Sequence, residues 1–206
     1  YNWDYETVDG RIRKLYQLGK ELNWNQESDL NWDQHYPHNQ PPVDQNFNPF
    51  VGYEPFEKLS DEEKLRFSWH NQSWTLSQFL HGEQGALLVA SQLTSCAPTF
   101  DAKLYAASQT FDEARHVETF NRYIQEKIGF MYPVNPHLKL LLDKILSDPR
   151  WDLKFIGMQI IIEGLALAAF NTMRMVSLDP LLKEIIYLIT RDEARLETED
   201  HVAYVF

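Results

Sequence analysis

The chain has 206 residues, a net charge of −11 and a single cysteine, Cys96. The length suffices for one sizeable core, the acidic balance weighs against nucleic acid as a partner, and one cysteine excludes an intramolecular disulfide and a cysteine-based zinc site. The sequence suggests neither a signal peptide nor a membrane span, so we predict a cytoplasmic protein. Because it begins at Tyr1 and ends at Phe206 inside a helical pattern, we expect the natural protein to be longer.

Residues 1–60 differ in character from the rest of the chain. They are rich in Asn, Gln and Pro and contain Trp24 and Trp32. Apolar residues at helical spacing predict a helix over Gly10–Asn23, and we expect the remainder to form an aromatic-rich arm wrapped on the body. A lid over a pocket is the alternative. We therefore divide the chain into an arm, residues 1–60, and a helical domain, residues 61–206.

Helical signals dominate from Ser60 onward. Ser60 and Glu63 form a capping box, the signature of a helix start. Long helices with interior carboxylates and no strand alternation predict an all-α helix bundle. The expected elements are four long helices and one connecting helix: Trp69–Thr94, Phe100–Gly129, Trp151–Val176, a helix starting near Pro180, and the connecting helix His137–Leu146.

A pair of similar segments recurs along the long helices. Glu83 is followed thirty positions later by Glu113, and Glu163 is followed thirty positions later by Glu193. Apolar residues three and four positions away place each glutamate on the core-facing side of its helix. Burying a carboxylate is costly unless a cation compensates its charge. Four such glutamates predict a shared site for a pair of metal ions.

The apolar neighbours define which side of each helix should face the core. Leu76 and Leu80 share the predicted face of Glu83, and Ile156 and Ile160 share that of Glu163. His81 lies two residues before Glu83 and is predicted to point away from the metals.

Glu113 and His116 are three residues apart and project from the same side of one turn. Two Glu-x-x-His helices and two single-glutamate helices build the di-iron or di-manganese site of four-helix bundles, and oxygen with imidazole ligands suits either metal. The alternative is a set of buried salt bridges to Arg115, Arg174 and Arg195, which seldom offset their desolvation.

Aspartates precede the second glutamate of each pair, at Asp112 and Asp192. Because ligating histidines usually donate their other ring proton to a carboxylate, we expect each aspartate to orient a histidine of the opposite half. Arg115 and Arg195 would brace these carboxylates. Ordinary interhelical salt bridges are the alternative.

The segments Phe79–Leu88, Asp112–His116 and Gly157–Phe170 resemble ferritin-like di-iron carboxylate proteins, the superfamily of ribonucleotide reductase small subunits, bacterial multicomponent monooxygenases and aminobenzoate N-oxygenases. The resemblance covers about Trp69–Arg195. It implies a ferritin-like four-helix bundle that holds two Fe ions, with Mn or mixed Mn/Fe as alternatives. It also implies metal-ligand roles for Glu83, Glu113, His116, Glu163 and Glu193.

The sequence departs from this pattern at Leu196, where the family would place a second histidine. His201 follows five residues later, about 12 Å along an uninterrupted helix from Glu193. Three explanations remain open: a bulge or break that brings His201 back, Glu197 as the additional ligand, or a rearranged part of the natural sequence. We take His201 as the sixth metal ligand.

Such a site predicts an oxidoreductase that activates O2 and oxidises a small organic substrate in an apolar pocket within the bundle. We expect no catalytic residue beyond the ligands, no organic cofactor, an electron donor such as a ferredoxin or reductase, and a homodimer. Small residues near the ligands would leave room for a substrate or, equally, permit close helix packing: Gly82, Gly85, Ala86, Gly164, Ala166 and Ala168.

Two alternative functions follow from the same ligand set. One is a ferroxidase or iron-handling protein, for which the long arm is unexpected. The other is a radical-generating subunit, which needs a tyrosine near the metals. Tyr123 is two turns beyond His116, and the nearer aromatic residue, Phe120, cannot form a phenoxyl radical.

Overall fold

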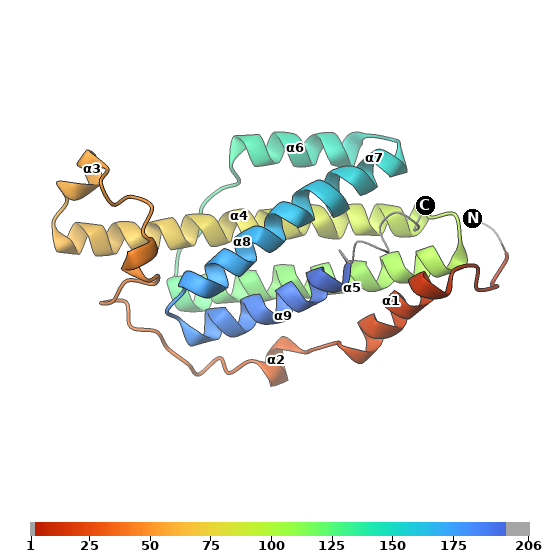
Figure 1. Ribbon diagram of the computed structural model, residues 1–206, viewed down its shortest axis with the longest axis horizontal. Coiled ribbons are helices and arrows are strands. Elements are labelled where there is room, and N and C mark those ends of the chain that lie inside the picture. The colour runs from red at the N-terminus through yellow and green to blue at the C-terminus, as the bar shows by residue number, and fades with distance from the viewer. Residues whose placement is uncertain (1–2, 197–206) are drawn as a thin grey trace.

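The computed structural model describes residues 3–196, which form a bundle of helices without a β-strand (Figure 1). The long helices α4 and α5 run antiparallel and side by side, while α8 and α9 pack on each other and cross them. The predicted all-α helix bundle is confirmed. The four bundle helices are α4 (Asp61–Cys96), α5 (Phe100–Tyr123), α8 (Glu163–Val176) and α9 (Pro180–Leu196).

Helix α4 begins at Asp61, eight residues before the predicted start at Trp69. The Ser60 side chain accepts a hydrogen bond from the Glu63 backbone, and the Glu63 carboxylate accepts one from the Ser60 backbone, so the capping box opens this helix. The prediction was wrong because the first two turns project beyond the core and carry mostly polar residues. Phe67 in these turns packs instead against Phe56 of the short helix α3 (Glu54–Glu57).

Helix α5 continues into a π-helical turn, η2 (Ile124–Ile128), and stops at Gly129. Gly129 has φ 88°, a left-handed conformation that costs glycine little and other residues more. The predicted stop at this glycine is confirmed. The predicted connecting helix is also present, as α6 (Pro136–Ser147).

The third predicted helix is one rod made of α7 (Trp151–Phe155), the π-helical segment η3 (Ile156–Ile162) and α8. Ile156 and Ile160 are 44% and 45% exposed, so their predicted core position is wrong. A π-turn holds more residues than an α-turn and rotates the preceding side chains relative to Glu163. Met158 and Gln159 are buried in their place.

The rod Trp151–Val176 is long and apolar enough to cross a membrane by composition alone, with a mean hydropathy of 1.7 in its most apolar window. Its inward side chains nevertheless belong to the bundle interior. Glu163, Phe170 and Met173 are all buried there.

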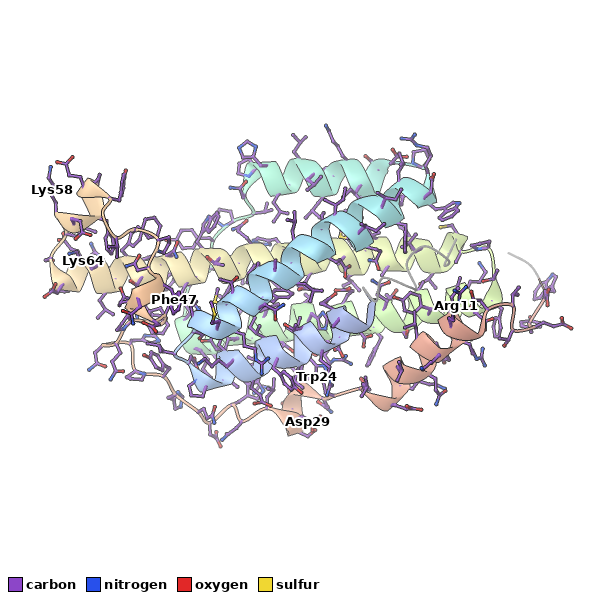
Figure 2. All side chains as sticks on the ribbon, in the orientation of Figure 1. Arg11, Trp24, Asp29, Phe47, Lys58 and Lys64 are labelled. Atoms are coloured by element: carbon purple, nitrogen blue, oxygen red, sulfur yellow. The ribbon has the colours of Figure 1, made fainter. Side chains whose placement is uncertain are left out.

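The arm lies along one side of the bundle (Figures 1 and 2). Its helix α1 (Gly10–Glu21) ends two residues before the predicted Asn23 and packs on α5. Three short segments follow, α2 (Gln26–Asp29), η1 (Gln45–Phe47) and α3. Trp24 and Trp32 are buried in the main core, as expected of anchoring aromatics. The division of the chain at residue 60 stays a prediction.

Substituting Gly129 should test the strain at the end of η2. Gly129→Ala is expected to lower the free energy of unfolding by about 1 kcal/mol, because alanine is strained at positive φ. Gly10→Ala is the matched control: a Cβ there meets nothing within 4 Å, and Gly10 is the first residue of a helix. Chemical denaturation measures both, and equal effects of the two substitutions would contradict the assignment.

Candidate metal centre

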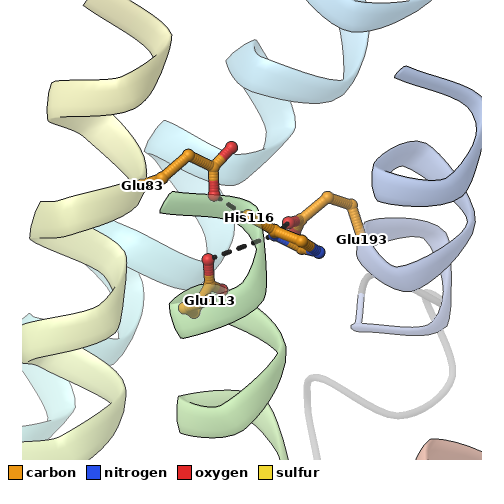
Figure 3. A group of neighbouring side chains, drawn as sticks. All are labelled: Glu83, Glu113, His116 and Glu193. Atoms are coloured by element: carbon orange, nitrogen blue, oxygen red, sulfur yellow. Dashed lines mark hydrogen bonds and ion pairs between the residues drawn. The ribbon is translucent and has the colours of Figure 1, made fainter. Parts of the chain in front are cut away.

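Four buried side chains from three helices meet in the middle of the bundle (Figure 3). Glu83 comes from α4, Glu113 and His116 from α5, and Glu193 from α9. One ligand atom of each lies within 4.8 Å of the ligand atoms of the others. Residues that are far apart in sequence are thus placed at one point, as a shared cation would require.

The imidazole of His116 is oriented by contacts on both sides. Its Nδ1 faces three carboxylates, at 3.1 Å from Glu193 Oε1, 3.3 Å from Glu83 Oε2 and 3.5 Å from Glu113 Oε2. Its Nε2 lies 3.3 Å from Asp192 Oδ2. A proton on Nε2 donated to Asp192 leaves the Nδ1 lone pair facing three anionic groups. That arrangement requires a cation between them, either a proton or a metal.

Asp192 is itself held by two further donors. Trp24 Nε1 and Arg115 Nη2 each donate to its Oδ2 at 2.7 Å. Arg115 also pairs with Asp112 at 2.7 Å, and its guanidinium lies 4.7 Å from the centre of the Trp24 ring. The expected roles of Asp192 beside the histidine and of Arg115 as a brace are therefore seen in the structure.

The alternative of salt bridges to the four glutamates does not fit the described residues. Arg115 pairs with the two aspartates, and Arg174 stacks over the Tyr187 ring at 4.6 Å. The Arg195 side chain lies outside the described residues, as do His201 and Glu197. The backbone of α9 is α-helical without a bulge as far as Leu196. The assignment of His201 as the sixth ligand stays a prediction, because His201 lies beyond the described residues.

Glu163 is buried beside this group but held differently. Its Oε1 accepts a hydrogen bond from Gln159 Nε2 at 2.8 Å, and its Oε2 accepts none from the described protein. Glu163, Glu83 and Glu193 line one cavity. The fourth predicted glutamate therefore adjoins the centre without belonging to the four-residue group.

Burial dominates the electrostatics of these groups. It raises the pKa of Glu113 and of Glu163 well above the usual range, and the charge of Glu193 raises both further. Burial disfavours the charged form of His116, but hydrogen bonds to Asp192 and the glutamates outweigh it and raise its pKa well above normal. Burial raises the pKa of Asp192, but the hydrogen bond and charge of His116, together with Arg115 and Trp24, outweigh it and lower the pKa to about 2.

The donor set fits a pair of divalent cations. Four carboxylates are buried around one imidazole, and Glu113 Oε1, Glu163 Oε2 and Glu193 Oε2 receive no hydrogen bond from the described protein. Buried carboxylate oxygens normally have partners, and two divalent ions would balance the four negative charges. Oxygen ligands with one imidazole suit iron or manganese.

An apolar cavity of about 280 Å³ adjoins the glutamates between α4, α6 and α8. Gly82, Ala86 and Ala166, which were predicted to leave space, line it together with larger apolar side chains. Gly85 instead permits close helix packing, the alternative prediction, because a Cβ there would lie 2.5 Å from Leu142 of α6. The larger lining residues are Phe79, Leu138, Leu141, Ile162, Leu165 and Phe170.

Two further side chains lie where the sequence placed them. His81 Nε2 contacts the Tyr132 carbonyl oxygen at 3.0 Å and is directed away from the cluster. The hydroxyl of Tyr123 donates to Asp179 at 2.6 Å, at the start of α9. Neither residue belongs to the glutamate–histidine group.

Sequence reasoning missed Trp24 and Gln159 as parts of the site. Gln159 precedes Glu163 by four residues and so could have been placed on its face. Trp24 could not have been connected to Asp192, because nothing in the sequence pairs residues so far apart.

No protein-family model and no curated protein matches the sequence. Solved structures match well. An R2-like ligand-binding oxidase from Sulfolobus acidocaldarius has 20% identity and a TM-score of 0.62, with 100% of this chain and 72% of that chain covered. An R2-like ligand-binding oxidase with an aerobically reconstituted Mn/Fe cofactor has 23% identity and a TM-score of 0.65, with 95% and 71% covered.

These similarities define the class of fold. The chain has the ferritin-like bundle of R2-like ligand-binding oxidases, so the resemblance predicted from the sequence is confirmed for the fold. The solved oxidase carries a Mn/Fe cofactor, and this chain has a buried group of carboxylates and an imidazole. The two findings agree with the predicted pair of metals, for which mixed Mn/Fe was an alternative.

The metal-free protein is expected to lose thermal stability as the pH rises from about 5 to about 8. Glu113, Glu163 and His116 have raised pKa values in the folded state, so folding favours their protonated forms. The stability they contribute is present at low pH and lost as the pH rises through the folded values, whereas Asp192 is already ionised. Calorimetry in chelator measures the trend, and a melting temperature that rises over this window would contradict it.

Glu113→Gln should separate metal binding from folding. Added Mn(II) should stabilise the wild type and so raise its melting temperature. At a free Mn(II) concentration a hundredfold above Kd, the gain in the free energy of unfolding is about 2.7 kcal/mol. The variant should lose this response while its metal-free form is at least as stable, because glutamine is neutral without having to take up a proton, as the buried Glu113 does. Glu118→Gln, exposed on the same helix, is the control. An unchanged metal response in Glu113→Gln would exclude Glu113 as a ligand.

Proposed function

We propose that the chain is a di-metal oxidoreductase that uses O2 to oxidise a small organic molecule in the cavity between α4, α6 and α8. The observation that carries this proposal is that the buried glutamates open onto an apolar cavity. Glu83, Glu163 and Glu193 form the polar end of a cavity whose other walls are apolar. A substrate bound there would meet the metal ligands directly.

The proposed ligands are Glu83, Glu113, His116, Glu163 and Glu193. The predicted His201 is the sixth. When bound, two iron ions, or one manganese and one iron, would supply the electrons that reduce O2 and the oxidising power for the substrate. The Mn/Fe cofactor of the structurally similar oxidase supports a mixed pair as an alternative to two irons.

The protein's own residues prepare the site in three ways. Asp192 fixes the His116 ring so that Nδ1 faces the glutamates. Arg115 pairs with both Asp192 and Asp112 and so offsets part of the negative charge beside the cluster. The apolar walls favour an apolar substrate over a charged one.

Other features of the proposal come from the chemistry. A two-electron oxidation of the substrate leaves two of the four electrons needed to reduce O2 to water, and a ferredoxin or reductase would supply these. We propose a cytoplasmic location and a homodimer as further expectations. The apolar cavity favours substrate oxidation over iron storage. The hydrogen bond from Tyr123 to Asp179, outside the cluster, weighs against a radical-generating subunit.

The function is tested by anaerobic loading with Fe(II) followed by mixing with O2. We expect an absorbance transient whose decay is faster with an arylamine or a fatty substrate, and a stoichiometric oxidised product in mass spectrometry. Accumulation of many irons per chain would instead indicate storage, and a persistent tyrosyl signal in electron paramagnetic resonance would indicate a radical-generating subunit. Either result would overturn the proposal.

Gly82→Leu should block the substrate and leave the metals in place. Gly82 lines the cavity, and a Cβ there meets nothing within 4 Å, so the new side chain can enter the cavity without a clash at its base. Metal content should stay at the wild-type level while substrate-dependent O2 consumption falls at least tenfold. Gly82→Ala is the control, since one methyl group leaves most of the cavity open. Equal turnover by Gly82→Leu and wild type would place the substrate elsewhere.

A further inference from the structure

Gln159 makes a buried contact with Glu163 that no other glutamate of the centre shares. Its Nε2 donates to Glu163 Oε1 at 2.8 Å, and the two side chains are 6% and 4% exposed. A carboxylate oxygen held by an amide donor is restricted in direction. The other oxygen, Glu163 Oε2, receives no hydrogen bond from the described protein and is buried.

Gln109 of α5 fixes the orientation of the Gln159 amide. The Gln109 Nε2 donates to Gln159 Oε1 in a short contact, and Gln109 is 1% exposed. The reverse orientation of Gln159 would bring its carbonyl oxygen against the Glu163 carboxylate, with two acceptors facing each other. The amide pair therefore forms a directed chain from α5 to Glu163.

The hydrogen bonds from Gln109 and Gln159 reach Glu163 and set it apart from the other three glutamates. Glu83, Glu113, His116 and Glu193 bring their ligand atoms within 4.8 Å of one another without Glu163. Glu163 adjoins them, because it lines the same cavity as Glu83 and Glu193. One cation can thus be held by the four-residue group alone, whereas a second needs Glu163.

We propose that Gln159, oriented by Gln109, is a positioning residue that holds Glu163 Oε1 and leaves Oε2 to face the second of two metal ions. The inference rests on the proposed di-metal function and adds an order of filling to it. The first metal binds to the four-residue group, and the second depends on the amide pair. Gln159 acts through Glu163 and does not touch a metal.

The test is an anaerobic titration of the metal-free protein with Mn(II), followed by calorimetry and electron paramagnetic resonance. The wild type should bind two ions in two steps and give the signal of a magnetically coupled pair. Gln159→Leu removes the donor at similar volume. It should leave the first Kd within about threefold and weaken the second by about 10- to 100-fold, the usual cost of losing a partner of a metal ligand. The spectrum should then be that of isolated Mn(II).

Two further variants separate the amide from its surroundings. Met158→Leu changes a fully buried neighbour on the same π-helical segment at similar volume, and it should keep both binding steps. Gln109→Leu leaves the Gln159–Glu163 hydrogen bond possible but frees its orientation, so it should weaken the second step by a smaller factor. Gln109→Leu also provides the test if Gln159→Leu does not fold, as judged by circular dichroism.

The outcomes distinguish this inference from the proposed function. Two normal binding steps in both glutamine variants would overturn the positioning role and leave the di-metal site intact. An equal loss in Met158→Leu, or an equal loss of both steps in Gln159→Leu, would also overturn it, because either result indicates a packing effect. A wild type that binds no Mn(II) or Fe(II) would overturn the proposed function itself.

Discussion

Uncompensated negative charge in an apolar interior is the constraint on which this molecule depends. The bundle buries Glu83, Glu113, Glu163 and Glu193, and within residues 3–196 the imidazole of His116 is the basic group that lies among them. Proteins rarely bury such charge without a partner, because desolvation of a carboxylate costs several kcal/mol. In the absence of a metal, shared protons are the available compensation. The helices therefore enclose a site that favours cations, and the surrounding residues hold its ligands in position.

The arm contributes directly to that support. Trp24 donates to Asp192, which contacts His116, and Arg115 connects Asp192 with Asp112 beneath the same indole ring. One continuous set of polar contacts thus runs from the N-terminal arm to the centre of the bundle. Loss of the arm would leave a buried aspartate short of a donor, so the segment does more than cover apolar surface.

Much of this arrangement could be predicted from local signals. Capping residues, helix-stopping prolines and the spacing of apolar residues gave the helices, and glutamates on core-facing stripes indicated the centre. Two kinds of information were not local. The contact of Trp24 with Asp192 depends on how the arm crosses the bundle. The burial of Met158 in place of Ile160 depends on backbone geometry, because periodicity arguments assume 3.6 residues per turn throughout.

The wide turn at Ile156–Ile162 has a consequence for how this protein tolerates insertions and deletions. Loss of one residue there would let the segment wind as an ordinary α-helix while the flanking turns kept nearly the same faces, because a π-helical turn takes up about one residue more than an α-helical turn. The same loss within the regular helix α8 would rotate all the preceding side chains by roughly 100° about the axis. A one-residue deletion should therefore be tolerated far better at this segment than elsewhere in the rod.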